Sequence, residues 1–148
     1  MAMDRAFVGR SFPFDEPYDV GRESIRQFAS AIGDDNSMYV DRVAARAAGH
    51  PDVVAPPTFL IAVVARAQDR VMFDPALGLD FSRVVHLDQR FVHHRPVVAG
   101  DVLHSTVHVD SIKVLAGNDV IAVRTEVTDA AGAAVATAHG TLVSRAAA

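Results

Sequence analysis

The 148-residue chain contains no cysteine and no tryptophan. Without cysteine it can form no disulfide, thiolate nucleophile or zinc–thiolate site, so the cytoplasm is the simplest expected location. The longest largely apolar run, Thr58–Ala65, is far shorter than the ~18 residues that a membrane-spanning helix needs. The amino terminus has no basic region followed by an apolar stretch, so we expect neither a membrane segment nor a signal peptide.

The chain also lacks an excess of positive charge. Its 14 basic and 18 acidic residues give a formal net charge of −4 at pH 7, whereas a nucleic-acid-binding domain usually carries a basic surface. No nucleic-acid partner is therefore expected. Half of the residues are apolar and 22% are charged, a balance that supports a buried core and excludes intrinsic disorder. The length predicts a single domain over residues 1–148.

Helical patterns occupy the first half of the chain. A first helix is predicted from apolar residues at helical spacing that end before Gly33: Ile25, Phe28, Ala29 and Ile32. A second, short helix is predicted to begin at Asp41 and to end at Gly49, with three residues facing inward: Val43, Ala44 and Ala47.

A third helix is predicted to begin at Pro57, where the missing N–H of proline costs nothing, and to end before Pro75. Its first two turns, Thr58–Ala65, are apolar on every side apart from one hydroxyl, and polar residues begin only at Arg66. A helix that is apolar all round is surrounded by protein. We therefore expect the start of this helix to be enclosed.

Strand patterns occupy the second half, over residues 83–95, 101–113, 119–129 and 134–144, with glycine in the intervening turns. In the second of these strands, apolar side chains alternate with polar ones, which indicates a sheet with one buried and one solvated face. Strands this long must twist. An α+β hot-dog fold, a long twisted antiparallel sheet wrapped around one buried helix, satisfies both halves of the chain. The alternative is an α+β domain with helices on a flat sheet.

The segment from Gly33 to Asp41 is the candidate site, because its polar side chains follow directly after a predicted helix end. Such groups can point into a neighbouring pocket. On spacing alone they can equally form a solvated loop, with Asp41 as the N-cap of the second helix.

A resemblance favours the first interpretation. The pattern Phe28-x4-Gly33-Asp34-x-Asn36-x-x-Tyr39-x-Asp41 resembles the Gly-Asp-x-Asn-Pro-x-His motif of the MaoC-like (R)-specific enoyl-thioester hydratases and dehydratases, which share the hot-dog fold. The similarity continues through residues 54–59, 85–91 and 95–101 and spans about Val8 to Arg145. It is greatest to the actinobacterial MaoC N-terminal-domain type, which includes the non-catalytic subunits of heterodimeric 3-hydroxyacyl-carrier dehydratases.

The resemblance places Asp34, Asn36 and Tyr39 at the positions of the family's catalytic motif. Dehydration of a 3-hydroxyacyl thioester needs a base for the α-proton, an acid for the leaving hydroxyl and N–H donors for the thioester oxygen. This chain departs from the motif because Tyr39 replaces the catalytic His and Ser37 replaces the proline. Pro57, which has no N–H, stands where a small residue offers a backbone donor.

Substrate contacts are expected from the start of the third helix, at Pro57, Thr58 and Phe59, and from His86 near the first long strand. His50 is a further candidate. His93 and His94 point to opposite faces of a strand, so at most one of them is expected to face a pocket. No motif for a metal, nucleotide or flavin cofactor is present, and the only expected ligand is an acyl-CoA or acyl-carrier thioester.

The chain is therefore predicted to act on 3-hydroxyacyl or enoyl thioesters of fatty-acid metabolism, as the acyl-chain-binding subunit of a dehydratase whose catalytic pair lies on a second MaoC-like chain. A homodimer or heterodimer is expected because a single hot-dog sheet leaves its edges open, and an acyl carrier protein is a possible partner. One alternative is a self-sufficient homodimeric hydratase that uses Asp34, and another is a non-catalytic acyl-CoA-binding protein. A thioesterase is disfavoured because Thr58–Ala65 contains no carboxylate.

Overall fold

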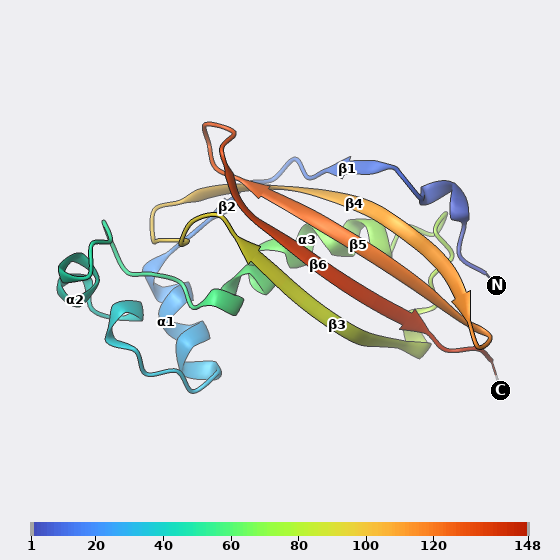
Figure 1. Cartoon of the computed structure of the whole chain (residues 1–148), viewed down its shortest axis with the longest axis horizontal. Helices are drawn as coiled ribbons and strands as arrows, with labels where there is room; N and C mark the ends of the chain where they lie inside the picture. The colour runs from blue at the N-terminus through green and yellow to red at the C-terminus, as the bar shows by residue number, and fades with distance from the viewer. Residues whose placement is uncertain (1, 148) are drawn as a thin grey trace.

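The computed structural model describes residues 2–147 (Figure 1). Three α-helices precede the four long strands along the chain: α1 (Arg22–Ala31), α2 (Arg42–Ala47), α3 (Leu60–Met72), then β3 (Val84–His93), β4 (Val102–Leu115), β5 (Asn118–Thr128) and β6 (Ala134–Ser144). Shorter elements complete the fold: η1 (Arg5–Phe7), β1 (Ser11–Pro13), β2 (Tyr18–Asp19), η2 (Ser37–Tyr39), η3 (Pro57–Phe59) and η4 (Phe81–Arg83). The four predicted strands are confirmed to within two residues at every end.

The strands form one antiparallel sheet in the order β1-β4-β5-β6-β3, and β2 pairs with β4 beside this path. The long strands twist and curve across α3, which lies against one face of the sheet (Figure 1). This is the predicted hot-dog arrangement. It leaves β3 at one edge of the sheet, with no partner strand on its outer side among residues 2–147.

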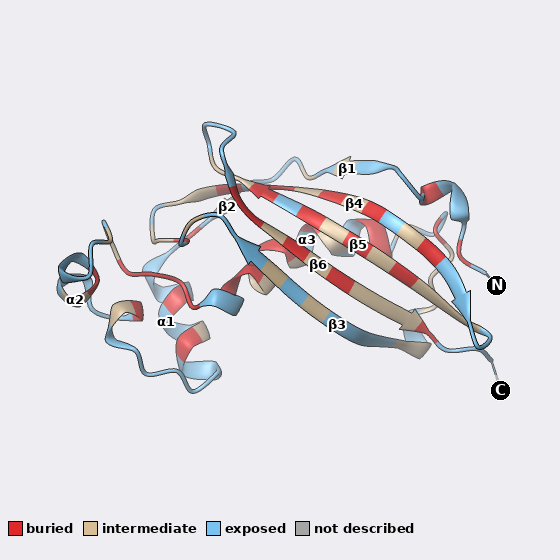
Figure 2. Ribbon diagram, viewed as in Figure 1, coloured by how far each residue is buried: buried red, intermediate tan, exposed pale blue. Residues whose placement is uncertain are grey.

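The predicted alternation along β4 is confirmed (Figure 2). Leu103, Val107 and Val109 are buried, whereas His104 and Asp110 between and beyond them are exposed. A β-bulge between Val109 and Ser111 then shifts the alternation by one residue, so that Ile112 is buried as well. One face of β4 therefore stays buried from Leu103 to Ile112.

Helix α1 covers the predicted apolar positions up to Ala31, and Ile25 and Ala29 are buried in the core. The prediction for Ile32 is wrong: α1 ends at Ala31, and the chain turns at Gly33 (φ +71°), which leaves Ile32 exposed. The inward face assigned to α2 is also wrong. Only Ala45 of this six-residue helix is buried, and Val43 is 75% exposed.

The third helix follows a short 3-10 turn, η3, in which Pro57 is the first residue. Its sheet-facing side is buried: Leu60, Val63, Val64, Ala67, Val71 and Met72. The expectation that Thr58–Ala65 is enclosed on all sides holds only in part, because Thr58 is exposed and Ile61, Ala62 and Ala65 are half-buried. Ile61 and Ala65 border a hollow that Val84 and His86 of β3 also line. Within residues 2–147, no helix has both the length and the apolar character needed to cross a bilayer.

A bidentate ion pair connects helix α1 to the segment before α3. Arg22 donates from Nε and Nη2 to the two carboxylate oxygens of Asp52, at 3.0 and 2.8 Å. Asp52 also accepts a hydrogen bond from the backbone N–H of Val53, at 2.8 Å. The Arg22 hydrogen bonds, followed by the Val53 N–H, hold the pKa of the Asp52 carboxyl well below its usual range.

This pKa shift predicts an acid-dependent contribution to stability. A carboxyl with a lowered folded-state pKa stabilises the fold above its unfolded-state pKa of about 3.9, and the stabilisation is lost as pH falls further. We expect Asp52→Asn to be less stable than the native chain at pH 7, and the difference in the free energy of unfolding to be smaller at pH 3, as measured by urea unfolding. Asp15→Asn, at a highly exposed carboxylate with one long ion pair of 3.5 Å, is the control and should show no such convergence. A gap between native chain and Asp52→Asn that stays constant with pH would contradict the prediction.

Candidate functional site

A cavity of about 450 Å³ lies at the start of α3. Its wall is largely apolar and comes from three separate stretches of chain: Met38, Val54, Ala55, Phe59, Leu60 and Val97. Backbone hydrogen bonds connect these stretches. The N–H of Val54 donates to the carbonyl of Met38 at 3.0 Å, and the N–H of Ala55 donates to the carbonyl of Val97 at 2.8 Å. The cavity is thus held by backbone contacts between segments far apart in the sequence.

The polar groups around this cavity are Tyr39, His50, His93, His94 and Arg95, and no carboxylate of the described chain lines it. The expectation that only one of His93 and His94 faces a pocket is wrong, since both line the cavity. The reason is local: β3 ends at His93, and His94 already lies in a bend where strand alternation no longer applies. Arg95 is held by an ion pair with Asp101 at 2.8 Å.

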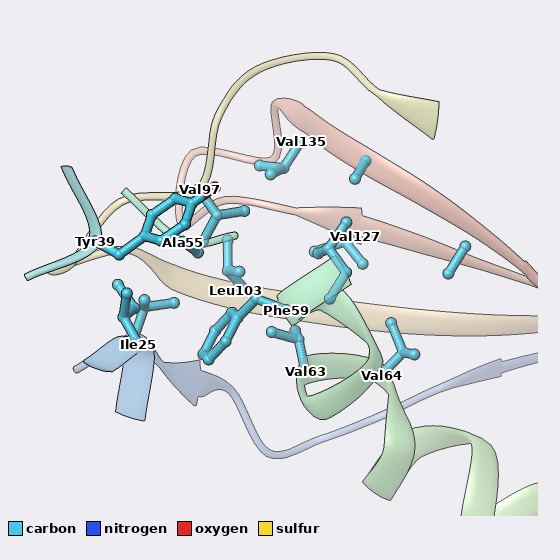
Figure 3. Packing of buried hydrophobic residues seen from close by; sticks show 14 of the residues in the cluster. Ile25, Tyr39, Ala55, Phe59, Val63, Val64, Val97, Leu103, Val127 and Val135 are labelled. Carbon is cyan, nitrogen blue, oxygen red and sulfur yellow. The ribbon is translucent and has the colours of Figure 1, made fainter. Parts of the chain in front are cut away.

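Tyr39 is buried and lies beside Ala55 and Val97 in the cavity wall (Figure 3). Burial raises the pKa of the Tyr39 phenol, and the charge and hydrogen bonding of the Asp34 carboxylate raise it further. The structure therefore brings Asp34 and Tyr39 together, as their places in the motif imply. With a pKa above its ordinary value of about 10, the phenol keeps its proton at neutral pH and can donate a hydrogen bond but cannot act as a base.

The other polar side chains of the segment organise its backbone. Asp34 accepts a hydrogen bond from the N–H of Asn36 at 3.2 Å, and Asn36 accepts one from the N–H of Met38 at 3.0 Å. Asp41 caps α2 through the N–H of Val43 at 2.8 Å, as predicted. Asp34 itself lines a different hollow, together with residues of α1 and with Val40. Its link to the cavity is Tyr39.

The start of α3 offers few backbone donors to the cavity. Pro56 and Pro57 both line it and have no N–H. The N–H of Phe59 is used by the carbonyl of Pro56 at 2.9 Å. Of the predicted contact residues, Pro57 and Phe59 line this cavity, and Thr58 is exposed outside it.

His86 is not part of this cavity. It lines a separate cavity of about 400 Å³ further along α3, so the structure does not bring His86 together with Tyr39. His104 and His108 do not line this cavity, and the strand spacing separates them by roughly 13 Å. His108 shares a hydrogen bond with Ser11 at 2.9 Å. Within residues 2–147, no three His, Cys, Asp or Glu side chains are grouped in a way that could hold a metal ion.

Comparison with known proteins places this geometry in context. The family described as "FAS1-like, dehydratase domain region" matches residues 6–138. The UPF0336 protein of Streptomyces avermitilis is 58% identical over 147 residues, which cover 99% of this chain and 98% of that protein. The UPF0336 protein of Saccharopolyspora erythraea is 53% identical over 145 residues, covering 98% and 93%.

Two solved structures resemble the fold closely. A MaoC-like dehydratase superposes with a TM-score of 0.86 at 39% identity, over 96% of this chain but only 43% of that longer chain. The C-terminally truncated HadBC (3R-hydroxyacyl-ACP dehydratase) complex of Mycobacterium tuberculosis superposes with a TM-score of 0.86 at 31% identity. That match covers 97% of this chain and 99% of the other.

Proposed function

The chain belongs to the FAS1-like dehydratase-region family, and from this premise we propose that it is the acyl-chain-binding subunit of an (R)-3-hydroxyacyl-thioester dehydratase. In this proposal a second, MaoC-like chain provides the catalytic Asp/His pair. One observation carries it: the apolar cavity is well formed, but Tyr39 occupies the position of the motif's histidine and holds its proton at neutral pH. The site is equipped to hold an acyl group and poorly equipped to move protons.

The departures from the family motif at Tyr39 and Pro57 are expected to lower the rate of dehydration. A base must remove the α-proton and an acid must protonate the leaving hydroxyl, and each such group contributes roughly 10²–10⁴ in rate. Donors for the thioester oxygen contribute roughly 10²–10³ more. This chain has no imidazole at position 39, no carboxylate lining the cavity in its described part, and two prolines at the start of α3. In this proposal those groups come from another chain.

An open sheet edge supports pairing with that second chain. Strand β3 has no neighbour on its outer side in the described chain, and it carries exposed apolar residues, among them Leu87 at 62%. A long edge strand with exposed apolar side chains favours association with another sheet. The similarity to HadBC, itself a complex of subunits, supports a heterodimer. The thioester carrier in this proposal is coenzyme A or an acyl carrier protein.

The proposal is tested by measuring the hydration of crotonyl-CoA and of a longer trans-2-enoyl-CoA. The readout is the loss of enoyl absorbance. We expect no measurable turnover by the purified chain and clear turnover after co-expression with a MaoC-like partner from the same genome. The partner alone is the necessary control, and it should be less active on the longer substrate than the pair. Turnover by this chain alone, at a rate equal to the pair, would overturn the proposal.

A self-sufficient hydratase is the second candidate, because three histidines line the cavity together with Tyr39: His50, His93 and His94. In that case Asp34 works through Tyr39 or through one of these imidazoles, and Asp34→Asn abolishes activity of the isolated chain. A third outcome, binding of crotonyl-CoA without hydration even in the presence of the partner, would favour a non-catalytic acyl-CoA-binding protein.

A further inference from the structure

A second cavity, of about 400 Å³, borders the same helix and strand as the first. The first cavity reaches Leu60 on the helix and His93 on the strand. The second begins at Ile61 on the helix side and is bordered by His86 and Leu142 on the sheet side. The first cavity therefore lies at the end of β3, and the second lies between α3 and the beginning of the same strand.

Two side chains of β3 lie along the strand between His93, which borders the first cavity, and His86, which borders the second. The inward face of β3 is identified by its partners on β6: His93 pairs with Ala136, Phe91 with Ala138 and Gln89 with Gly140. These β6 residues are buried. A β-bulge between His86 and Asp88 returns His86, paired with Leu142, to the same face. The inward order is thus His93, Phe91, Gln89, His86, with Phe91 and Gln89 between the cavities.

Gln89 is the unusual member of this row. Both its amide nitrogen and its amide oxygen are inaccessible to solvent, and neither has a hydrogen-bond partner within residues 2–147. A buried amide without partners is unfavourable and requires an explanation. The side chain lies over Gly140, where an added Cβ would come within 3.0 Å of its Oε1 and within 3.8 Å of Nε2 of His86. The absence of a side chain at position 140 makes room for it.

The neighbouring side chains have contacts of the kind that Gln89 lacks. Gln68 on α3, which borders the second cavity, donates to the hydroxyl of Thr125 at 3.0 Å. Phe91 packs against the main hydrophobic cluster. Gln89 is therefore the side chain of the partition that can move without losing a hydrogen bond or a place in the main hydrophobic cluster, which includes Phe91.

We propose that Gln89 sets the acyl-chain length that this protein accepts, by separating the two cavities along α3. This inference rests on the proposed acyl-binding function. A short acyl chain fits in the first cavity and does not meet Gln89. A long chain must displace the amide before its distal methylenes reach the apolar wall of the second cavity, formed by Ile61, Ala65, Met72 and Leu142. Each methylene buried there contributes to affinity only after that displacement.

Gln89→Ala tests the proposal, with the affinities of crotonyl-CoA and palmitoyl-CoA measured by isothermal titration on the chain and on its complex with the partner. We expect the crotonyl-CoA affinity to stay within twofold of the native value and the palmitoyl-CoA affinity to rise at least tenfold. Urea unfolding should show Gln89→Ala folded at the temperature of the titration. Gln89→Met, which keeps the bulk of the side chain, should retain most of the native selectivity.

Val92→Ala is the matched control, since Val92 is a neighbour on the same strand that points to the opposite, exposed face. It should change neither affinity. An equal gain for both ligands, or no gain for palmitoyl-CoA, would overturn the role of Gln89 and leave the proposed function standing. If the native chain and the complex bind neither acyl-CoA, the proposed function fails, and this inference fails with it.

Discussion

Replacing Tyr39 by His together with Pro57 by Gly is expected to raise enoyl-CoA hydration by the isolated chain by at least about a hundredfold. The first change puts an imidazole, which can exchange protons near neutral pH, where the phenol keeps its proton. The Asp34 carboxylate, whose charge and hydrogen bonding raise the pKa of the present phenol, is the group expected to orient the new ring. The second change introduces a backbone N–H at the border of the cavity, where Pro57 has none. Initial rates of crotonyl-CoA hydration measure the effect.

The control variant is Tyr39→Phe with Pro57→Gly, which has the new N–H and a similar ring but no proton-transferring group. It should stay at the native background. Adding Asp34→Asn to the active double variant should remove most of the gain, because the imidazole then loses its carboxylate partner. If the phenylalanine control gains as much as the histidine variant, the position of Tyr39 is not a catalytic position in this chain.

Phe59→Ala is expected to lower the free energy of unfolding by about 3–5 kcal/mol, the cost typical of truncating a fully buried phenylalanine. Phe59 is 1% exposed. Its ring makes edge-on contacts with Tyr18 and Phe28, at centroid distances of 6.0 and 5.5 Å, and such contacts add to the effect of burial. It also joins the start of α3 to α1 and to the amino-terminal segment. Urea unfolding followed by circular dichroism measures the loss.

Phe73→Ala is the comparison. Phe73 stacks on Phe81 with a centroid distance of 3.9 Å, but its side chain is 60% exposed. Truncation there should cost less than about 1 kcal/mol, since little apolar surface returns to water. Equal losses for the two variants would mean that the cluster around Phe59 is not the main core at this end of the molecule.

The contrast between elements shows which patterns carry enough information for prediction. The long strands were predictable because ten or more residues of alternation repeat the same signal many times, and a sheet with one buried face leaves no other register. Helix α2 was placed correctly by its cap, Asp41, but its inward face was wrong. Six residues make fewer than two turns, so periodicity cannot specify which side meets the core.

The candidate site divides in the same way. The motif led to Tyr39 and to the start of α3, and the structure places both at one cavity. The motif did not predict that Asp34 lies outside that cavity. The direction of the Asp34 side chain depends on the left-handed turn at Gly33 and on the local hydrogen bonds of the loop. Both His93 and His94 line the cavity because β3 ends at His93. Gln89 carried no signal at all, since a glutamine in a largely exposed edge strand has an ordinary sequence context.

The sequence by itself determined the elements, the buried face of the sheet and the chemistry available at position 39, because these depend on local periodicity and on the identity of single side chains. Tertiary structure decided which distant segments meet: the joining of residues 38, 55 and 97 around one cavity, and the crossing of Gln89 over Gly140 between two cavities. Such contacts depend on strand register, on two bulges and on the path of loops. Those features are settled by the packing of the whole sheet against α3, and no local stretch of residues encodes them.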